Sequence, residues 1–282
     1  MKPPDRSSPN PLLRDDSAET NGHPRSPRRF RRLFVRGILL AVVLLSTPIA
    51  WNFASGNFGV VAEGRFYRSA QMTAAGLGRT VRDYGIKTVI NLRGHHPEAA
   101  WYRNERDSTL EAGAVQVDMA LSSCDWMSRT QLRTLVDVLD TSKPPVLVHC
   151  WRGAERTGLA SAFAVLLREG STLAEAKAEF SPAYLFLRMG DGVTTIEHLE
   201  QYECWLARLG ETHTPARFRQ WVAEGFVPGT PSRETWPYDP YPLVVTTRPG
   251  VDGPVVRKVW DDRGRAEAGV ARLGDGDTAP SR

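Results

Sequence analysis

Hydrophobic and polar positions between residues 57 and 210 repeat with two different periods, one typical of strands and one typical of helices. The runs 86–92 and 144–150 are continuously apolar and rich in β-branched residues, as in strands that are covered on both faces. Residues 114–121 alternate like a strand, and residues 128–142 carry Leu and Val at helical spacing. This succession predicts an α/β fold with a central, mostly parallel sheet flanked by helices on both faces.

Two helix starts carry capping signals. Ser128 precedes the apolar stripe of one predicted helix, and Thr172 stands three residues before Glu175, which is the spacing of a capping box. Residues 157–170 are apolar nearly all round, which predicts a central buried helix. After residue 212 the chain becomes rich in Pro, Gly and Trp, so we expect residues 213–282 to form an irregular extension and a loose tail.

The N-terminal region combines a basic cluster with an uncharged apolar run. Residues 1–36 hold nine Lys/Arg against four acids, and no charge follows between Arg36 and Glu63. We expect a disordered basic segment at 1–33 and a transmembrane signal-anchor at 34–54, while a cleaved signal peptide and a buried helix of a soluble protein stay open as alternatives. The positive flank predicts a cytoplasmic N-terminus and an extracytoplasmic folded domain, residues 57–212, anchored in the membrane.

Charge and cysteine content exclude several classes of protein. The net charge of +4 is concentrated near the N-terminus, which argues against a nucleic-acid partner. The three cysteines lack metal-ligand spacing and are too few for a disulfide scaffold, so no metal site is expected. Cys204 is interpreted as a core residue. Cys150 differs from an ordinary thiol through its neighbours.

The stretch HCWRGAERTG, residues 149–158, connects a predicted buried strand to the apolar helix. The carboxyl end of such a strand and the amino end of the next helix form a site where anions bind. Gly153 lets the backbone turn inward, and Arg156 supplies a guanidinium fork that matches phosphate oxygens. These positive surroundings predict a low pKa for Cys150, with Thr157 donating to its sulfur, and a thiolate there is a nucleophile for phosphorus.

These residues carry a family resemblance. The signature H-C-x-x-G-x-x-R-[ST] is matched by His149, Cys150, Gly153, Arg156 and Thr157. Residues 57–209 therefore resemble the cysteine-dependent protein tyrosine and dual-specificity phosphatases, and in particular the bacterial, membrane-anchored members of the dual-specificity branch. The stretches RFYRSAQ (65–71), GIKTVINLRG (85–94) and YECWL (202–206) support the resemblance more weakly. It implies a phosphomonoester hydrolase that forms a phosphocysteine and needs neither metal nor cofactor.

The resemblance also implies an aspartate that protonates the leaving oxygen from a loop upstream of the cysteine. Asp125, in SSCDWMS, follows a strand and precedes a helix, so it is favoured. Asp118 is the alternative, although it falls inside the alternating run 115–121. A helix-capping role would also explain Asp125.

The remaining loop residues are expected to contact substrate: Trp151, Arg152, Gly153, Ala154, Glu155 and Thr157, with His149 in a supporting role. Arg152 adds positive charge and Glu155 removes some, so a phosphorylated protein and a phosphoinositide both stay open as substrates. For Arg93 a surface salt bridge is the favoured interpretation, with approach to the site as the alternative. Cys124 is next to Asp125, and a closed loop would bring it within disulfide reach of Cys150.

Two other function classes use similar features. A rhodanese-like sulfurtransferase also carries a nucleophilic loop cysteine, although it usually has fewer residues between Cys and Arg. A noncatalytic phosphate-binding module would ordinarily lack the nucleophile or the arginine, and this chain has both. A phosphoinositide or inositol-phosphate phosphatase of the same fold is the nearest alternative to a protein phosphatase.

Overall fold

The structure of the protein is a computed structural model that describes residues 27–190, 192–232, 234, 243–254 and 271–272. The chain divides into two units, residues 1–46 and residues 47–282. Helix α1, Pro27–Ala54, includes the segment expected to anchor the chain in a membrane. Among the described residues, no helix combines the length and the apolar character that crossing a membrane requires, so that expectation is not supported. Most of the segment expected to be disordered, residues 1–26, lies outside the described residues.

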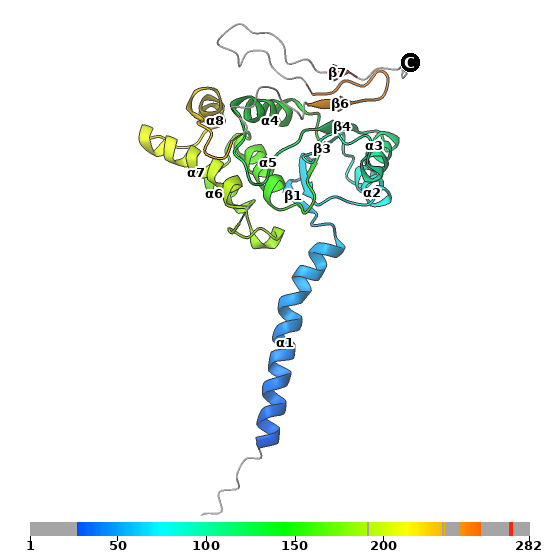
Figure 1. Ribbon diagram of the computed structural model, residues 1–282, viewed down its shortest axis with the longest axis vertical. Helices are drawn as coiled ribbons and strands as arrows, with labels where there is room; N and C mark the ends of the chain where they lie inside the picture. Colours follow the sequence, from blue (N-terminus) through cyan, green and yellow to red (C-terminus); the bar gives the residue numbers. More distant parts are fainter. Residues whose placement is uncertain (1–26, 191, 233, 235–242, 255–270, 273–282) are drawn as a thin grey trace, which may run out of the picture. The chain divides into compact units, whose positions relative to one another are not determined.

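The second unit is built on one mixed sheet with the strand order β1-β2-β5-β3-β4-β6-β7 (Figure 1). Strands β2, β5, β3 and β4 are parallel, and β1 and β6 run antiparallel to their inner neighbours. The strand bounds are β1 Gly59–Ala62, β2 Phe66–Ser69, β3 Thr88–Asn91, β4 Val115–Asp118, β5 Val146–His149, β6 Val244–Thr246 and β7 Ala271–Arg272. The mostly parallel sheet expected from the sequence is confirmed.

Helices cover both faces of this sheet. Helices α2 and α3 pack on one face, and α4 to α8 lie on the other (Figure 1). Their bounds are α2 Ala74–Asp83, α3 Ala100–Glu111, α4 Arg129–Thr141, α5 Glu155–Leu166, α6 Leu173–Ala178, α7 Gly192–Leu209 and α8 Pro215–Gln220, with the short helices η1 Pro182–Tyr184 and η2 Trp221–Gly225. The central helix, α5, is buried along most of its length, as its apolar sequence predicts.

Local sequence signals set the helix starts. Ser128 accepts from the Gln131 amide while the Gln131 side chain accepts from the Ser128 amide, which is a complete capping box at the start of α4. Thr172 and Glu175 form the same arrangement at the start of α6. Both caps satisfy amides that have no partner inside the first turn of a helix.

The segment after residue 212 is more regular than its composition suggests. Phe218 and Trp221 are fully buried in the same hydrophobic cluster as the residues of α4 and α5. Further along, Val244, Val245 and Thr246 pair with the outer side of β4. Apolar aromatic residues in this segment therefore contribute to the main core.

Register across the sheet brings four strand ends into one row. His149 at the end of β5 pairs with Ser69 of β2 and Asn91 of β3, and Asn91 pairs with Asp118 of β4. The loops that leave these strands must therefore emerge side by side. This edge is where open α/β sheets bind ligands.

Candidate active site

Cys150 is the first residue after β5, and its side chain is buried at the floor of the loop that leads into α5. We call residues 150–156 the Cys150 loop. The Gly153 amide donates to the Cys150 sulfur over 3.2 Å. An inward-pointing amide at the start of a buried helix is the feature that makes such loops attractive to anions.

Three consecutive carbonyls of the Cys150 loop are held away from the sulfur by donors from residues 57–71. The Trp151 carbonyl accepts from the Gln71 amide over 3.2 Å. The Arg152 carbonyl accepts from Nδ2 of Asn57 over 2.9 Å. The Gly153 carbonyl accepts from Nη2 of Arg68 over 2.8 Å. Since carbonyl and amide of one peptide point in opposite directions, tying the carbonyls outward turns the amides inward.

Arg68 is fully buried, and a buried arginine normally requires an ion-pair or hydrogen-bond partner. Its Nη1 donates to the backbone oxygen and to Oε2 of Glu179, each over 2.7 Å, and its guanidinium stacks on Tyr184 at 3.8 Å from the ring centroid. Burial lowers the pKa of Arg68, and the charge of Glu179 opposes that effect. The buried ion pair therefore fixes the arginine that holds the Gly153 carbonyl.

Glycine is the residue type that fits at position 153. Its φ is +72°, a region that other residues rarely adopt, and an added Cβ would lie 2.5 Å from the Ala70 nitrogen and 2.7 Å from the Ser69 carbonyl. The glycine lets the loop pass directly over the end of β2. The sequence expectation that Gly153 turns the backbone inward agrees with this geometry.

Arg156 is held between the ends of two strands. Its Nη1 donates to the carbonyls of Leu92 and Leu121, over 3.3 Å and 3.2 Å. These two residues follow β3 and β4, so the arginine spans the row of strand ends beside the Cys150 loop. Its positive charge also lowers the pKa of the Cys150 thiol.

The Cys150 thiol has a pKa below its ordinary value. Burial alone would raise the pKa, but the positive charge of Arg156 and hydrogen bonds from Thr157 and from the Gly153 amide lower it further than burial raises it. A buried sulfur that is more acidic than an ordinary thiol is poised to be a thiolate. The arrangement can therefore direct a nucleophilic sulfur at a bound oxyanion.

Behind the loop, His149 belongs to a buried polar cluster on the α3 side of the sheet. Its Nε2 lies 3.2 Å from Oε1 of Glu105, and both side chains are 2% exposed. Burial lowers the pKa of His149, but Glu105 outweighs burial and the pKa is raised. Glu105 therefore favours the protonated form of the residue that precedes Cys150.

The two candidate acids occupy different environments. Asp118 is fully buried in the cluster behind the loop, where Oδ2 accepts from Tyr102 over 2.6 Å and Oδ1 accepts from Asn91 and Gln116 over 2.9 and 3.0 Å. Burial raises its pKa to about 6, against those three hydrogen bonds. Both of its oxygens are occupied by neighbours inside the protein, which disfavours Asp118 as a proton donor to a substrate.

Asp125 lies on the loop between β4 and α4, four residues after the Leu121 carbonyl that Arg156 contacts. It is partly exposed, and its amide donates to the Ser122 hydroxyl over 3.0 Å. The next residues fasten this loop to α7, because Trp126 stacks on His198 at 4.3 Å between centroids and the Met127 amide donates to Nε2 of His198 over 3.2 Å. Asp125 thus lies on the loop whose first residues contact Arg156, whereas Asp118 is buried behind it.

The outer residues of the Cys150 loop differ in exposure. Trp151 is 63% exposed and Arg152 is exposed beside it, with the guanidinium 5.8 Å from the indole ring. Glu155 is half-buried at the start of α5, and Ala154 is buried. The exposed pair therefore stands at the mouth of the site, whereas Ala154 contributes backbone alone.

The other two cysteines do not take part. Cys124 and Cys204 are exposed and all three cysteines are free. The interpretation of Cys204 as a core residue is therefore wrong, because it lies on the outward side of α7. Within the part of the chain that the structure describes, no cluster of His, Cys, Asp and Glu side chains is arranged to hold a metal ion.

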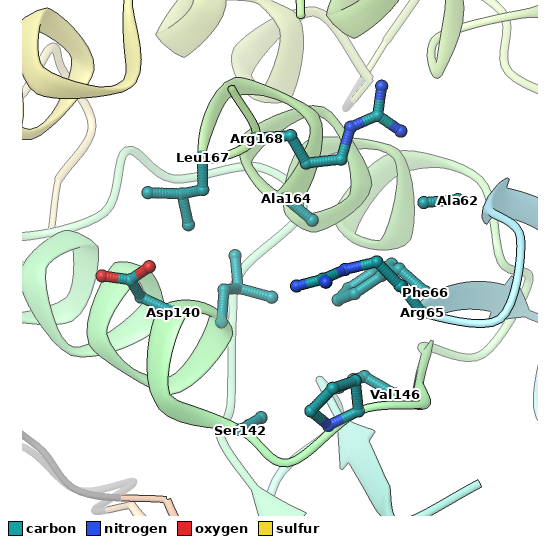
Figure 2. Close-up of a pocket in the computed structure, with 11 residues that line it drawn as sticks. Ala62, Arg65, Phe66, Asp140, Ser142, Val146, Ala164, Leu167 and Arg168 are labelled. Carbon is teal, nitrogen blue, oxygen red and sulfur yellow. The ribbon is translucent and has the colours of Figure 1, made fainter. Parts of the chain in front are cut away.

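A separate pocket of about 160 Å³ lies at the other end of β5 and α5 (Figure 2). Its lining includes Arg65, Phe66, Asp140, Val146, Leu167 and Arg168. The pocket lies beside Val146, which begins β5, and Leu167, which follows α5. Cys150 lies at the opposite ends of both elements, after β5 and before α5. This pocket is therefore distinct from the Cys150 loop.

Comparison with known proteins points to one family. Residues 49–183 match the family model described as a DSP-PTPase phosphatase fused to NAD+ kinase. Among curated proteins, none matches the chain.

Several solved structures are similar in outline. TpbA of P. aeruginosa is 19% identical, with 55% of this chain and 92% of that chain covered and a TM-score of 0.43. The core catalytic domain of the PP-IP phosphatase SIW14 from S. cerevisiae is 20% identical, with 55% and 93% covered and a TM-score of 0.40. A phosphatase from Neisseria meningitidis is 22% identical, with 44% and 86% covered and a TM-score of 0.35.

Proposed function

We propose that this chain, whose residues 49–183 match a DSP-PTPase family model, is a cysteine-dependent dual-specificity-type phosphatase that hydrolyses phosphomonoesters by way of a phosphocysteine on Cys150. The observation that carries the proposal is the Cys150 loop itself. Three neighbouring carbonyls are tied outward, one amide donates to the sulfur, and the thiol pKa is lowered. Inward amides and a buried thiolate suit a phosphoryl group better than they suit a neutral substrate.

In the first step the Cys150 thiolate attacks phosphorus and the bond from phosphorus to the ester oxygen breaks. Asp125 gives its proton to that departing oxygen, so an alcohol or phenol leaves. The equatorial oxygens of the phosphoryl group accept from loop amides and from Arg156, which stabilise the transition state. The enzyme then carries a bond between sulfur and phosphorus.

In the second step water attacks phosphorus while the Asp125 carboxylate accepts its proton. The sulfur–phosphorus bond breaks, inorganic phosphate leaves, and the thiolate is restored. Protons and electrons balance over the cycle, and no redox partner is required. Trp151 and Arg152 at the mouth of the site, with Glu155, Ala154 and Thr157 in the loop, are proposed to contact the substrate.

Acid quenching during turnover of para-nitrophenyl phosphate tests this proposal. We expect phosphorus bound to residue 150 in the wild type and none in Cys150→Ser, which should have no turnover yet still bind a phosphate analogue such as tungstate. Activity should persist in EDTA. Full turnover by Cys150→Ser, or sulfur transfer from thiosulfate without phosphatase activity, would contradict the proposal and favour a rhodanese-like enzyme.

A further inference from the structure

Arg93 is the side chain beside the site that the phosphocysteine mechanism leaves without a role. It follows β3 directly and is half-buried. Its guanidinium lies over Trp101 of α3, with Cζ 3.6 Å from the ring centroid, and its Nη1 donates to Oε1 of Gln71. A stacked, hydrogen-bonded guanidinium has a fixed orientation.

The partners of Arg93 tie it to the Cys150 loop. The backbone amide of Gln71 donates to the Trp151 carbonyl over 3.2 Å, so the same residue touches both Arg93 and the loop. The neighbouring Leu92 accepts from Arg156 over 3.3 Å and donates to the His149 carbonyl over 2.9 Å. Arg93 therefore lies at the rim of the site on the β3 side.

The charges that face Arg93 come from the site and from behind it. Its pKa is lowered, first by burial; the charge of Arg156 lowers it too, whereas Glu105 and Cys150 act in the opposite direction. Glu105 is committed to His149 in the buried cluster. The charges of Arg93 and Arg156 thus act on one another beside the Cys150 sulfur.

The expectation of a surface salt bridge for Arg93 is wrong. Among the described residues no carboxylate forms an ion pair with its guanidinium, and Gln71 is the side chain that accepts from it. A guanidinium has five N–H donors, so one bond to Gln71 leaves most of its hydrogen-bonding capacity for another acceptor.

We propose that Arg93 binds a second negatively charged group of the substrate, a carboxylate or a phosphate next to the phosphoryl group that Arg156 holds. This inference rests on the proposed phosphatase function and narrows its substrate class to esters that carry an additional anion near the scissile phosphate. The planar fork matches carboxylate and phosphate oxygens equally well, so the chemistry is shared by acidic phosphopeptides and by molecules with several phosphates. Arg93 acts on affinity and orientation, not on bond breaking.

Three matched aryl esters test the proposal: phenyl phosphate, 3-carboxyphenyl phosphate and resorcinol bisphosphate. We expect wild-type enzyme to favour the second or the third over phenyl phosphate, and the better of these two identifies the source of the second anion. In Arg93→Met that preference should fall about tenfold or more, mainly through KM, as expected for loss of a charge-assisted hydrogen bond. Arg93→Lys should retain part of it, because the charge persists without the fork.

The control is Arg219→Met, since Arg219 pairs with Asp140 near the pocket of Figure 2. Its substrate preference should equal that of the wild type. Equal loss on all three esters in Arg93→Met would show a purely structural role and overturn the proposal, as would no loss on any of them or no preference in the wild type. Absence of hydrolysis of all three esters by the wild type would instead overturn the phosphatase function itself.

Discussion

Nε2 of His149 and Oε1 of Glu105 lie 3.2 Å apart in a buried cluster directly behind the candidate nucleophile. Glu105 raises the pKa of His149 against the effect of burial. The pair favours the protonated form of the histidine one residue before Cys150, and its acidic member comes from α3, far from the loop in sequence. Glu105 is thus a positioning residue that acts through His149.

Replacing Glu105 by Gln should make Cys150 a weaker acid. Without the carboxylate, burial would keep His149 neutral, and the thiolate would lose a nearby positive charge. We expect a higher pKa for Cys150, read from the pH dependence of alkylation by iodoacetamide. Glu111→Gln, at the exposed end of the same helix, is the control and should leave the alkylation profile unchanged. An unaltered profile in Glu105→Gln would remove Glu105 from this role.

Asp125→Asn should slow esters with poor leaving groups more than activated ones. Phenolate needs a proton to leave, whereas nitrophenolate leaves readily without one. We expect kcat/KM to fall about 100-fold for phenyl phosphate and less than about 10-fold for para-nitrophenyl phosphate. Asp118→Asn should instead lower stability, because it disturbs the hydrogen bonds from Tyr102, Asn91 and Gln116. A uniform small effect of Asp125→Asn on both esters would transfer the acid role elsewhere.

Gly153→Ala should strongly reduce catalysis because the added Cβ clashes with β2 residues, and Gly170→Ala separates this clash from backbone strain. Gly170 has φ +73°, nearly the same as the +72° of Gly153, but an added Cβ there meets no atom within 4 Å. Both variants should therefore lose about 1 kcal/mol or more of stability from the left-handed backbone. Only Gly153→Ala should lose activity, on the order of 100-fold, because its Cβ would displace the loop from Ala70. Equal activity in the two variants would contradict the outward-carbonyl account.

His198 should make the protein sensitive to acid. Burial lowers its pKa to about 4 from the ordinary 6.5, and its neutral Nε2 accepts from the Met127 amide. A histidine with a lowered pKa contributes stability above the unfolded value, and this is lost as pH falls from about 6.5 toward 4, by up to about 3 kcal/mol. Urea unfolding at pH 7.5 and pH 4.5 should show a smaller acid loss in His198→Gln than in the wild type. Identical losses would mean that His198 is accessible to protons in the folded state.

The sequence predicted those parts of the structure that depend on local pattern. The alternation of strands and helices, the capping boxes at Ser128 and Thr172, and the strand–loop–helix around Cys150 all follow from periodicity or from contiguous residues. Long-range partners could not be predicted in this way. Asn57 and Arg68 contact the Cys150 loop across 95 and 85 residues, and Glu105 meets His149 across a sheet. An arginine in the middle of the buried segment RFYRSAQ was the one available signal for Arg68.

Exposure was also harder to predict than secondary structure. Cys204 stands next to Trp205, yet helix rotation turns it outward, and Arg93 stacks on Trp101 and donates to Gln71 although it stands at a strand end. Trp126, by contrast, is 9% exposed because it stacks on His198. In each case the deciding contact comes from an element that lies elsewhere in the chain.

The donors that hold the loop carbonyls outward all come from residues 57–71, which precede the loop by many residues in the chain. A fragment beginning at β3 would keep Cys150, Arg156 and α5. It would lack the donors that orient the peptides of the Cys150 loop. Catalytic competence should consequently appear late in folding, only once the first hairpin has docked against β5. Any partner or substitution that loosens that hairpin would silence the enzyme while leaving every residue of its signature in place.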